Sequence, residues 1–132
     1  MRAVDVGLYS KLSADTALVA LLSADTPMFN MEAPPNTDMP YVIFFSAGGG
    51  PDSITPSDLR SMVYGVKGVA STLNAAASID ARIDTLLHNQ SITVSGYTNI
   101  WLARETDVQL VEAAPDGNPI YQYGAYYRIR ID

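Results

Sequence analysis

The segment Tyr41–Phe45 limits the fold of this 132-residue chain more than any other part of it. All of its residues are aromatic or β-branched, the types that strands favour, so the segment predicts a strand. Odd and even positions are both apolar, whereas one layer of helices covers only one face of a sheet. Two arrangements satisfy the second face: the sheet curls on itself, or a neighbouring subunit covers it.

The residues before this strand predict two helices and a short strand. Apolar side chains recur at helical spacing in both helical segments, and Asp15 has the side chain of a helix N-cap. The predicted elements are helix 3–12, helix 16–22, edge strand 28–31 and a proline-bearing loop 32–39.

The residues after this strand predict a loop, a strand and a long helix. Gly48, Gly49 and Gly50, followed by a proline, predict that the strand ends there and that a loop runs to about residue 58. The next predicted elements are strand 59–69 and helix 71–88, whose apolar stripe comprises Leu73, Ala76, Ala77, Ile83, Leu86 and Leu87.

The last third of the chain predicts strands at 92–94, 97–104, 106–113 and 119–131. Pro115 to Asn118 is a turn sequence, because proline fixes φ and Gly117 supplies a left-handed residue, so the final two strands should form a hairpin. The fold class is therefore α+β: a single domain over residues 1–132, with a mostly antiparallel sheet flanked by an N-terminal helix pair and one long helix. The predicted order is α-α-β-β-β-α-β-β-β.

The composition excludes several kinds of chemistry. The chain has no cysteine, which removes disulfides, thiolate zinc sites and cysteine nucleophiles, and its single histidine, His88, should end the long helix. Gly48–Gly50 lacks the following lysine of a phosphate loop. Asp80 and Asp84 could hold a metal, but a solvated helix face is the better interpretation. We therefore expect no enzyme, no metal and no cofactor.

Charge and hydropathy restrict the partners. The net charge is −6, from 8 basic and 14 acidic residues, and the basic residues are scattered, so we expect no tight DNA binding. No apolar stretch approaches the roughly 20 residues that span a bilayer, and we expect folding in the cytoplasm without membrane contact. Tyr121, Tyr123, Tyr126 and Tyr127 could stack on bases, but a core or a subunit interface fits them better.

The order of elements and several local sequences resemble the tail terminator (tail completion) proteins of long-tailed bacteriophages, over nearly the whole chain. The resemblance rests on the amphipathic first helix, the segment 15–22, the segment 40–44 after the proline-bearing loop, the alanine-rich helix ending at 83–87, and Tyr127-Arg128-Ile129 in the last strand. One departure is Gly65 to Val69, which is more glycine-rich than expected before a helix.

The resemblance implies a non-enzymatic virion protein of the head–tail junction. Such proteins form hexameric rings, cap the tail tube, meet the head connector or head-completion protein, and let genomic DNA pass. Our own candidates for partner contacts are the loops 32–39 and 46–58, with Phe44, Gly48, Gly49, Gly50, Asp52 and Tyr123. The alternatives are another neck or head-completion ring protein, or a small ligand-binding or enzymatic α+β domain.

Overall fold

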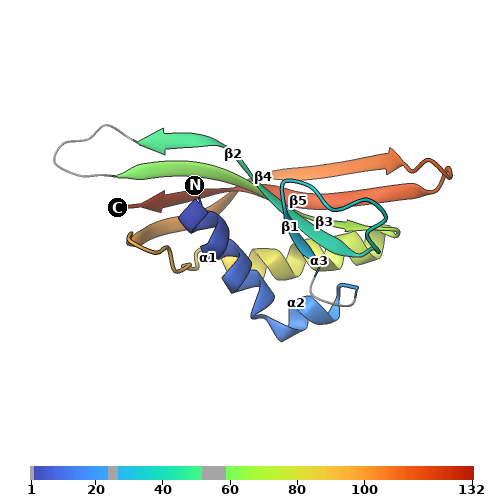
Figure 1. Ribbon diagram of the computed structural model, residues 1–132, viewed down its shortest axis with the longest axis horizontal. Helices are drawn as coiled ribbons and strands as arrows, with labels where there is room; N and C mark the ends of the chain where they lie inside the picture. Colours follow the sequence, from blue (N-terminus) through green and yellow to red (C-terminus); the bar gives the residue numbers. More distant parts are fainter. Residues whose placement is uncertain (1, 24–26, 52–58) are drawn as a thin grey trace.

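Three helices lie on one face of a five-stranded sheet, in a computed structural model that describes residues 2–23, 27–51 and 59–132 (Figure 1). The strand order in the sheet is β1-β2-β3-β5-β4, and every neighbouring pair is antiparallel except β1 with β2. The elements are α1 (Arg2–Ser13), α2 (Thr16–Ala20), β1 (Met28–Asn30), β2 (Tyr41–Pro51), β3 (Arg60–Ala70), α3 (Leu73–Leu87), β4 (Asn99–Ala113) and β5 (Pro119–Ile131).

The predicted fold class and the order of its elements are confirmed, with one joining of segments. The segments 97–104 and 106–113 form the single strand β4, whose register with β5 shifts between Arg104 and Thr106. This bulge inserts one residue and interrupts the apolar alternation, which is why the sequence suggested two strands. The segment predicted as strand 92–94 contributes only the isolated bridge between Val94 and Tyr97.

The strand β2 is longer than predicted, because the glycines continue it. Gly48, Gly49 and Gly50 pair with Val63, Met62 and Ser61 of β3, so the prediction of a loop opening at Gly48 is wrong. The register shifts between Ser46 and Gly48, and Gly49 has φ of 110°, a value that glycine adopts without strain. The glycines therefore carry an irregular strand. Residues 52–58 of the predicted loop lie outside the described part of the chain.

The helices close one face of the sheet with fully buried apolar side chains. Val4, Leu8 and Leu12 of α1 and Ile79 and Ile83 of α3 have no solvent exposure. Asp15 caps α2 as predicted, since its carboxylate accepts a 2.8 Å hydrogen bond from the Leu18 backbone N–H. The predicted stripe of α3 is wrong at one end: Leu73 is 46% exposed, and Ile79 lies in the core instead.

Two glycines explain the glycine-rich stretch in β3. A Cβ on Gly68 would lie 2.4 Å from Cγ2 of Ile79, so glycine lets α3 approach the sheet closely. A Cβ on Gly65 would lie 2.4 Å from Cζ of Phe45, so glycine lets that ring lie across the strand on the other face. The departure from expectation at 65–69 is thus a packing requirement on both faces of β3.

Two polar groups buried beneath the helices, the Tyr64 hydroxyl and the Asp80 carboxylate, are hydrogen-bonded. The Tyr64 hydroxyl, at the centre of the core, donates a 2.7 Å hydrogen bond to the Asp5 carboxylate, and burial raises the pKa of Tyr64. Arg104 of β4 donates two hydrogen bonds, of 2.9 and 3.0 Å, to the Asp80 carboxylate on α3. Asp80 is only 16% exposed, so its interpretation as part of a solvated helix face is wrong: it holds β4 against α3.

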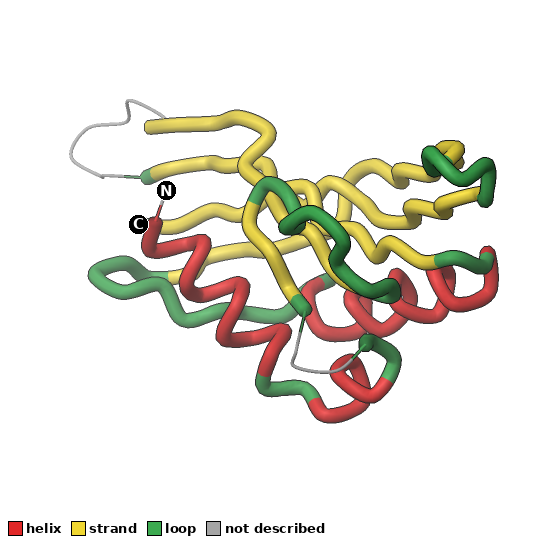
Figure 2. Tube along the Cα trace, turned by 45° about the vertical axis from the view of Figure 1, so that its right-hand side comes forward, coloured by secondary structure: helices red, strands yellow, loops and turns green. Residues whose placement is uncertain are grey.

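The sheet extends beyond its helices at both ends of the long axis. The β4–β5 hairpin projects at one end, on the right of Figure 1, and the far part of β2 and β3 projects at the other. Figure 2 shows both extensions as paired strands. We call the hairpin from Thr106 to Tyr126 the β4–β5 arm.

Candidate interaction surface

The face of the sheet that no helix covers is the surface most in need of explanation. Side chains alternate along a strand, so the residues paired across the sheet with Phe45, Lys67 and Tyr126 share this face. We call it the open face. Its apolar and central polar members include Phe29, Tyr41, Ile43, Phe45, Lys67, Val69, Val108, Leu110, Gln122 and Tyr126, of which Val69 is almost fully buried.

Phe45 is the structural centre of the open face. Its ring lies over Gly65 and packs edge-to-face with Tyr126, with ring centroids 6.2 Å apart and planes at 89°. At the neighbouring edge, Phe29 of β1 packs edge-to-face on Tyr41 at 6.1 Å. Both pairs are half-buried within the single chain, so their rings still offer area for a further contact.

The ammonium group of Lys67 lies beside the aromatic rings of the open face. The Lys67 ammonium donates a hydrogen bond to Oε1 of Gln122 and lies 5.9 Å from the centroid of the Phe45 ring. Gln122 is only 7% exposed although it faces away from the helices. Burial, and then the negative charge of Glu112, raise the pKa of Tyr41. The open face around Tyr41 is therefore partly shielded from water even in the single chain.

The open face is hollowed where two strands that are not neighbours converge. Phe45 of β2 and Val108 and Leu110 of β4 line one hollow of about 70 Å³, although β3 and β5 lie between those strands. The sheet therefore curls in part, which is the first of the two predicted arrangements. The curl leaves Leu110 47% exposed, so it does not cover the face completely. A hollow of this size is below the roughly 300 Å³ at which small-molecule sites begin.

Further exposed apolar side chains continue along β4. Ile100 is 54% exposed, Trp101 42% and Val111 63%. Trp101 lies on the same side of the sheet as Leu110, whereas Val111, paired with Tyr121, faces the opposite side. Exposed apolar side chains gathered on one edge strand are typical of a protein contact, whereas single ones need no explanation. On α1, Val6 and Tyr9 are also exposed, at 49% and 42%.

The sequence-predicted contact residues do not lie together. Phe44 is 3% exposed and faces the helices, as part of the core. Tyr123 is half-buried on the same helix-facing side, and Gly48–Gly50 lie in the projecting part of β2. Asp52 lies outside the described residues. As contact residues all six stay predictions, but Phe44 offers almost no area to a partner.

The residues that sequence reasoning considered for chemistry have structural roles. His88 caps α3 as predicted, and its Nδ1 accepts a 3.0 Å hydrogen bond from the backbone N–H of Arg104. Asp80 and Asp84 both approach Arg104, at 2.9 and 3.6 Å. Among the described residues no group of three His, Cys, Asp or Glu side chains could hold a metal ion, and none of the helices described there is long and apolar enough to cross a membrane.

Sequence reasoning placed Tyr126 among four tyrosines of a core or a subunit interface, but it missed Phe45 and Gly65 as members of the open face. A signal was present for both of these residues. Phe45 belongs to the two-faced strand, and Gly65 is a glycine inside a strand, which often marks the close approach of another group. No local signal connects Val108 and Leu110 to Phe45, because the contact depends on how the sheet curls.

Comparison with solved structures places this fold among known chains. It superposes on a chain from the virion of a native gene transfer agent particle with a TM-score of 0.78, at 15% identity, over 97% of this chain and 93% of that one. A second solved structure, which carries no functional description, matches with a TM-score of 0.57 and 12% identity, over 97% and 94% of the two chains. No protein-family model and no curated protein matches the sequence. At these identities the likeness shows a shared fold.

Proposed function

We propose that this chain is a structural subunit of a phage-like particle, without enzymatic activity. The observation that carries the proposal is the open face: an apolar, aromatic sheet surface that a single chain leaves half exposed. The full-length likeness to a chain of a gene transfer agent virion supports it, because that chain is itself part of an assembled particle. The order of elements, which resembles phage tail terminators, points in the same direction.

Within that class, the proposed role is a ring-forming tail terminator at the head–tail junction. The ring, a homohexamer, caps the tail tube protein and provides the joint to the head connector or a head-completion protein. Six subunits of charge −6 give a ring of about −36, which repels DNA phosphates and limits sticking as the genome passes. Ring closure needs two different patches on each subunit, and this chain has separate exposed apolar groups on α1 and on β4.

The alternative with the most in common is another ring protein of the neck, which would differ only in its partner. The two are separated by adding purified tail-tube polymer. A tail terminator forms a complex with tube ends, visible by electron microscopy, and stops further addition of tube subunits.

Oligomeric state provides the broader test. Native mass spectrometry should show a ring-sized homo-oligomer, either of the protein alone or after mixing with tail-tube protein. A strict monomer that ignores tube protein and binds a metabolite would contradict the structural role and favour the small ligand-binding domain.

A further inference from the structure

One side of α1 carries an exposed stripe of side chains. Arg2, Val6 and Tyr9 are spaced by four and then three residues, so they lie along one side of the helix. Val6 and Tyr9 are 49% and 42% exposed. Arg2 is exposed and, within residues 2–23, 27–51 and 59–132, makes no ion pair. We call these three residues the α1 stripe.

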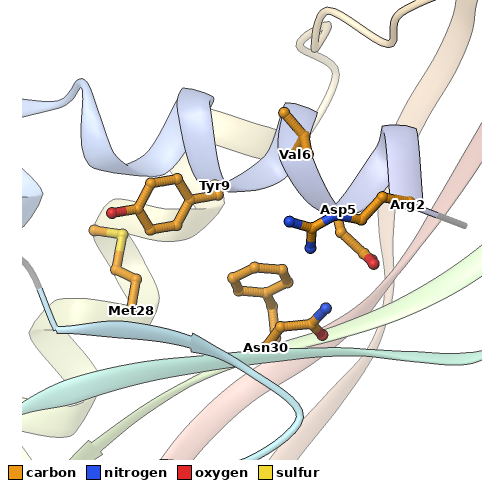
Figure 3. Close-up of a pocket in the computed structure, with 7 residues that line it drawn as sticks. Arg2, Asp5, Val6, Tyr9, Met28 and Asn30 are labelled. Carbon is orange, nitrogen blue, oxygen red and sulfur yellow. The ribbon is translucent and has the colours of Figure 1, made fainter.

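A groove of about 270 Å³ runs beside the α1 stripe. The stripe lines one side of it, and Met28, Asn30 and Phe44 of β1 and β2 line the other (Figure 3). Most of this lining is apolar, and the Arg2 guanidinium extends over the groove in the same view. Asp5 also lines the groove, and its carboxylate already accepts the hydrogen bond from Tyr64. A surface of this kind suits an apolar side chain that is followed by an acidic one.

The β4–β5 arm presents that combination. Val108, Leu110 and Glu112 alternate along β4 and so project from the same face, the open face. Leu110 is 47% exposed, and Glu112 is exposed with no ion pair among the described residues. Between residues 106 and 126 the sequence has the acids Asp107, Glu112 and Asp116 and neither lysine nor arginine. Asp107 pairs with Arg104, so Glu112 is the charge that the open face of the arm presents.

The two surfaces match in charge and in spacing. Along a helix, Val6 and Tyr9 lie about 6 and 10 Å beyond Arg2. Along a strand, Leu110 and Val108 lie about 7 and 13 Å beyond Glu112. Placing Arg2 opposite Glu112 therefore brings the two apolar members of each surface to corresponding positions. The ion pair fixes the direction of docking, and the apolar contacts supply the burial.

The two surfaces cannot meet within one chain, because the arm projects from the opposite end of the molecule to the one at which α1 begins (Figure 1). We propose that the α1 stripe of one copy docks on the open face of the β4–β5 arm of the next copy. The contact is heterologous and propagates until a ring closes. It also places a helix over the second face of the sheet, which is the second of the two predicted arrangements. This inference rests on the proposed ring function and names the contact that closes the ring.

Charge reversal tests the ion pair. Arg2→Glu and Glu112→Arg should each raise the concentration needed for half assembly by about tenfold, because each places like charges opposite one another. The double variant Arg2→Glu/Glu112→Arg should restore assembly. As a control, Arg2→Glu combined with Asp38→Arg, which reverses an exposed acid of the 32–39 loop instead of Glu112, should not restore it. Native mass spectrometry measures all four variants, and circular dichroism checks that each is folded.

Cross-linking tests the position. Because the chain has no cysteine, Ser10→Cys beside Tyr9 and Thr106→Cys on the open face of the arm can be introduced together as its only thiols, both at exposed positions. A short bis-maleimide should give a ladder of covalent oligomers in the assembled protein. The control pair, Ala81→Cys on the exposed side of α3 with Thr106→Cys, should stay monomeric on denaturing gels.

The outcomes separate this contact from the proposed function. Ring-sized oligomers without rescue by the double reversal and without the ladder would overturn the contact and leave the ring intact. A protein that forms no oligomer, with or without tail-tube protein, would overturn both. Rescue together with the ladder establishes the contact.

Discussion

Both faces of the sheet carry aromatic side chains, but those side chains are fully buried on one face and only half-buried on the other. The helix-covered face holds Tyr64 and Tyr127 without any solvent exposure, and the Tyr64 hydroxyl is bonded to Asp5. The open face holds Phe45 and Tyr126, which pack on one another but remain half-buried. The helices of the same chain bury the apolar side chains of the covered face, whereas the curl of the sheet buries those of the open face only in part. Stability should therefore depend on the first and assembly on the second.

Truncating one side chain on each face should give the largest contrast. Ile83→Ala removes a fully buried side chain of α3 and should lower the free energy of unfolding by about 2–5 kcal/mol. Leu110→Ala on the open face should lower it by less than about 1 kcal/mol, because Leu110 is 47% exposed. Urea denaturation at concentrations that keep the protein monomeric measures both. Equal losses would show that the open face is part of the stabilising core.

Arg104 and Arg128 lie on opposite faces of the sheet, so replacing them should also lower the stability by different amounts. Arg104→Gln deprives the Asp80 carboxylate, 16% exposed, of both its hydrogen bonds and should cost about 1.5–3 kcal/mol. Arg128→Gln, which loosens the pair with Glu105 at the surface, should cost under about 1 kcal/mol. Thermal unfolding followed by circular dichroism compares them. A larger effect at Arg128 would contradict the ranking of the two faces.

Substituting Gly65 or Gly68 tests the two faces of the sheet within the single strand β3. Gly68→Ala places a methyl group against Ile79 of α3, which is held in the core, and should cost about 1–3 kcal/mol. Gly65→Ala meets the Phe45 ring on the open face, where the ring can move aside, so its cost should be smaller. Urea midpoints decide the order. Gly65→Ala should instead impair assembly, because it displaces the ring at the centre of the open face.

The smallest effect concerns the link between α2 and α3. The hydrogen bonds from Arg82 hold the pKa of the Asp15 carboxyl below its usual value. A lowered pKa contributes stability above the unfolded value, about 3.9, and this contribution disappears as the pH falls through the folded value. Asp15→Asn keeps an N-cap but not the charge. It should be slightly less stable at pH 7, and urea titrations should show this difference shrinking as the pH falls below about 3.9 and vanishing once the Asp15 carboxyl of the folded parent is protonated. A constant difference would assign the effect to the cap.

Much of the fold follows from local sequence, because local signals determine local elements. The capping chemistry of Asp15, the periodicity of α3 and the turn around Gly117 each predict an observed feature. The glycines Gly48–Gly50 predict a loop but form part of a strand, because glycine alone does not show whether a neighbouring strand supplies hydrogen bonds. The interaction surface could be predicted in part: the two-faced strand required a second cover, and the structure shows an open face there.

The sequence does not predict which residues far apart in the chain come into contact. Arg104 meets Asp80 from a different element, and the hollow joins Phe45 with Leu110 across two intervening strands. Neither follows from periodicity, because both depend on the twist and curl of the finished sheet. The predicted contact residue Phe44 shows the same limit: alternation within a two-faced strand does not reveal which face the helices cover.

The most direct test of the account is oxidative footprinting of side chains before and after assembly, read by mass spectrometry. The account predicts that Leu110 and Tyr126 on the open face, with Tyr9 on α1, lose reactivity when the oligomer forms. Leu73, 46% exposed on α3, should keep its reactivity and serves as the internal control. Unchanged reactivity at Leu110 and Tyr126 in an assembled particle would contradict the claim that the open face is the surface through which this chain assembles.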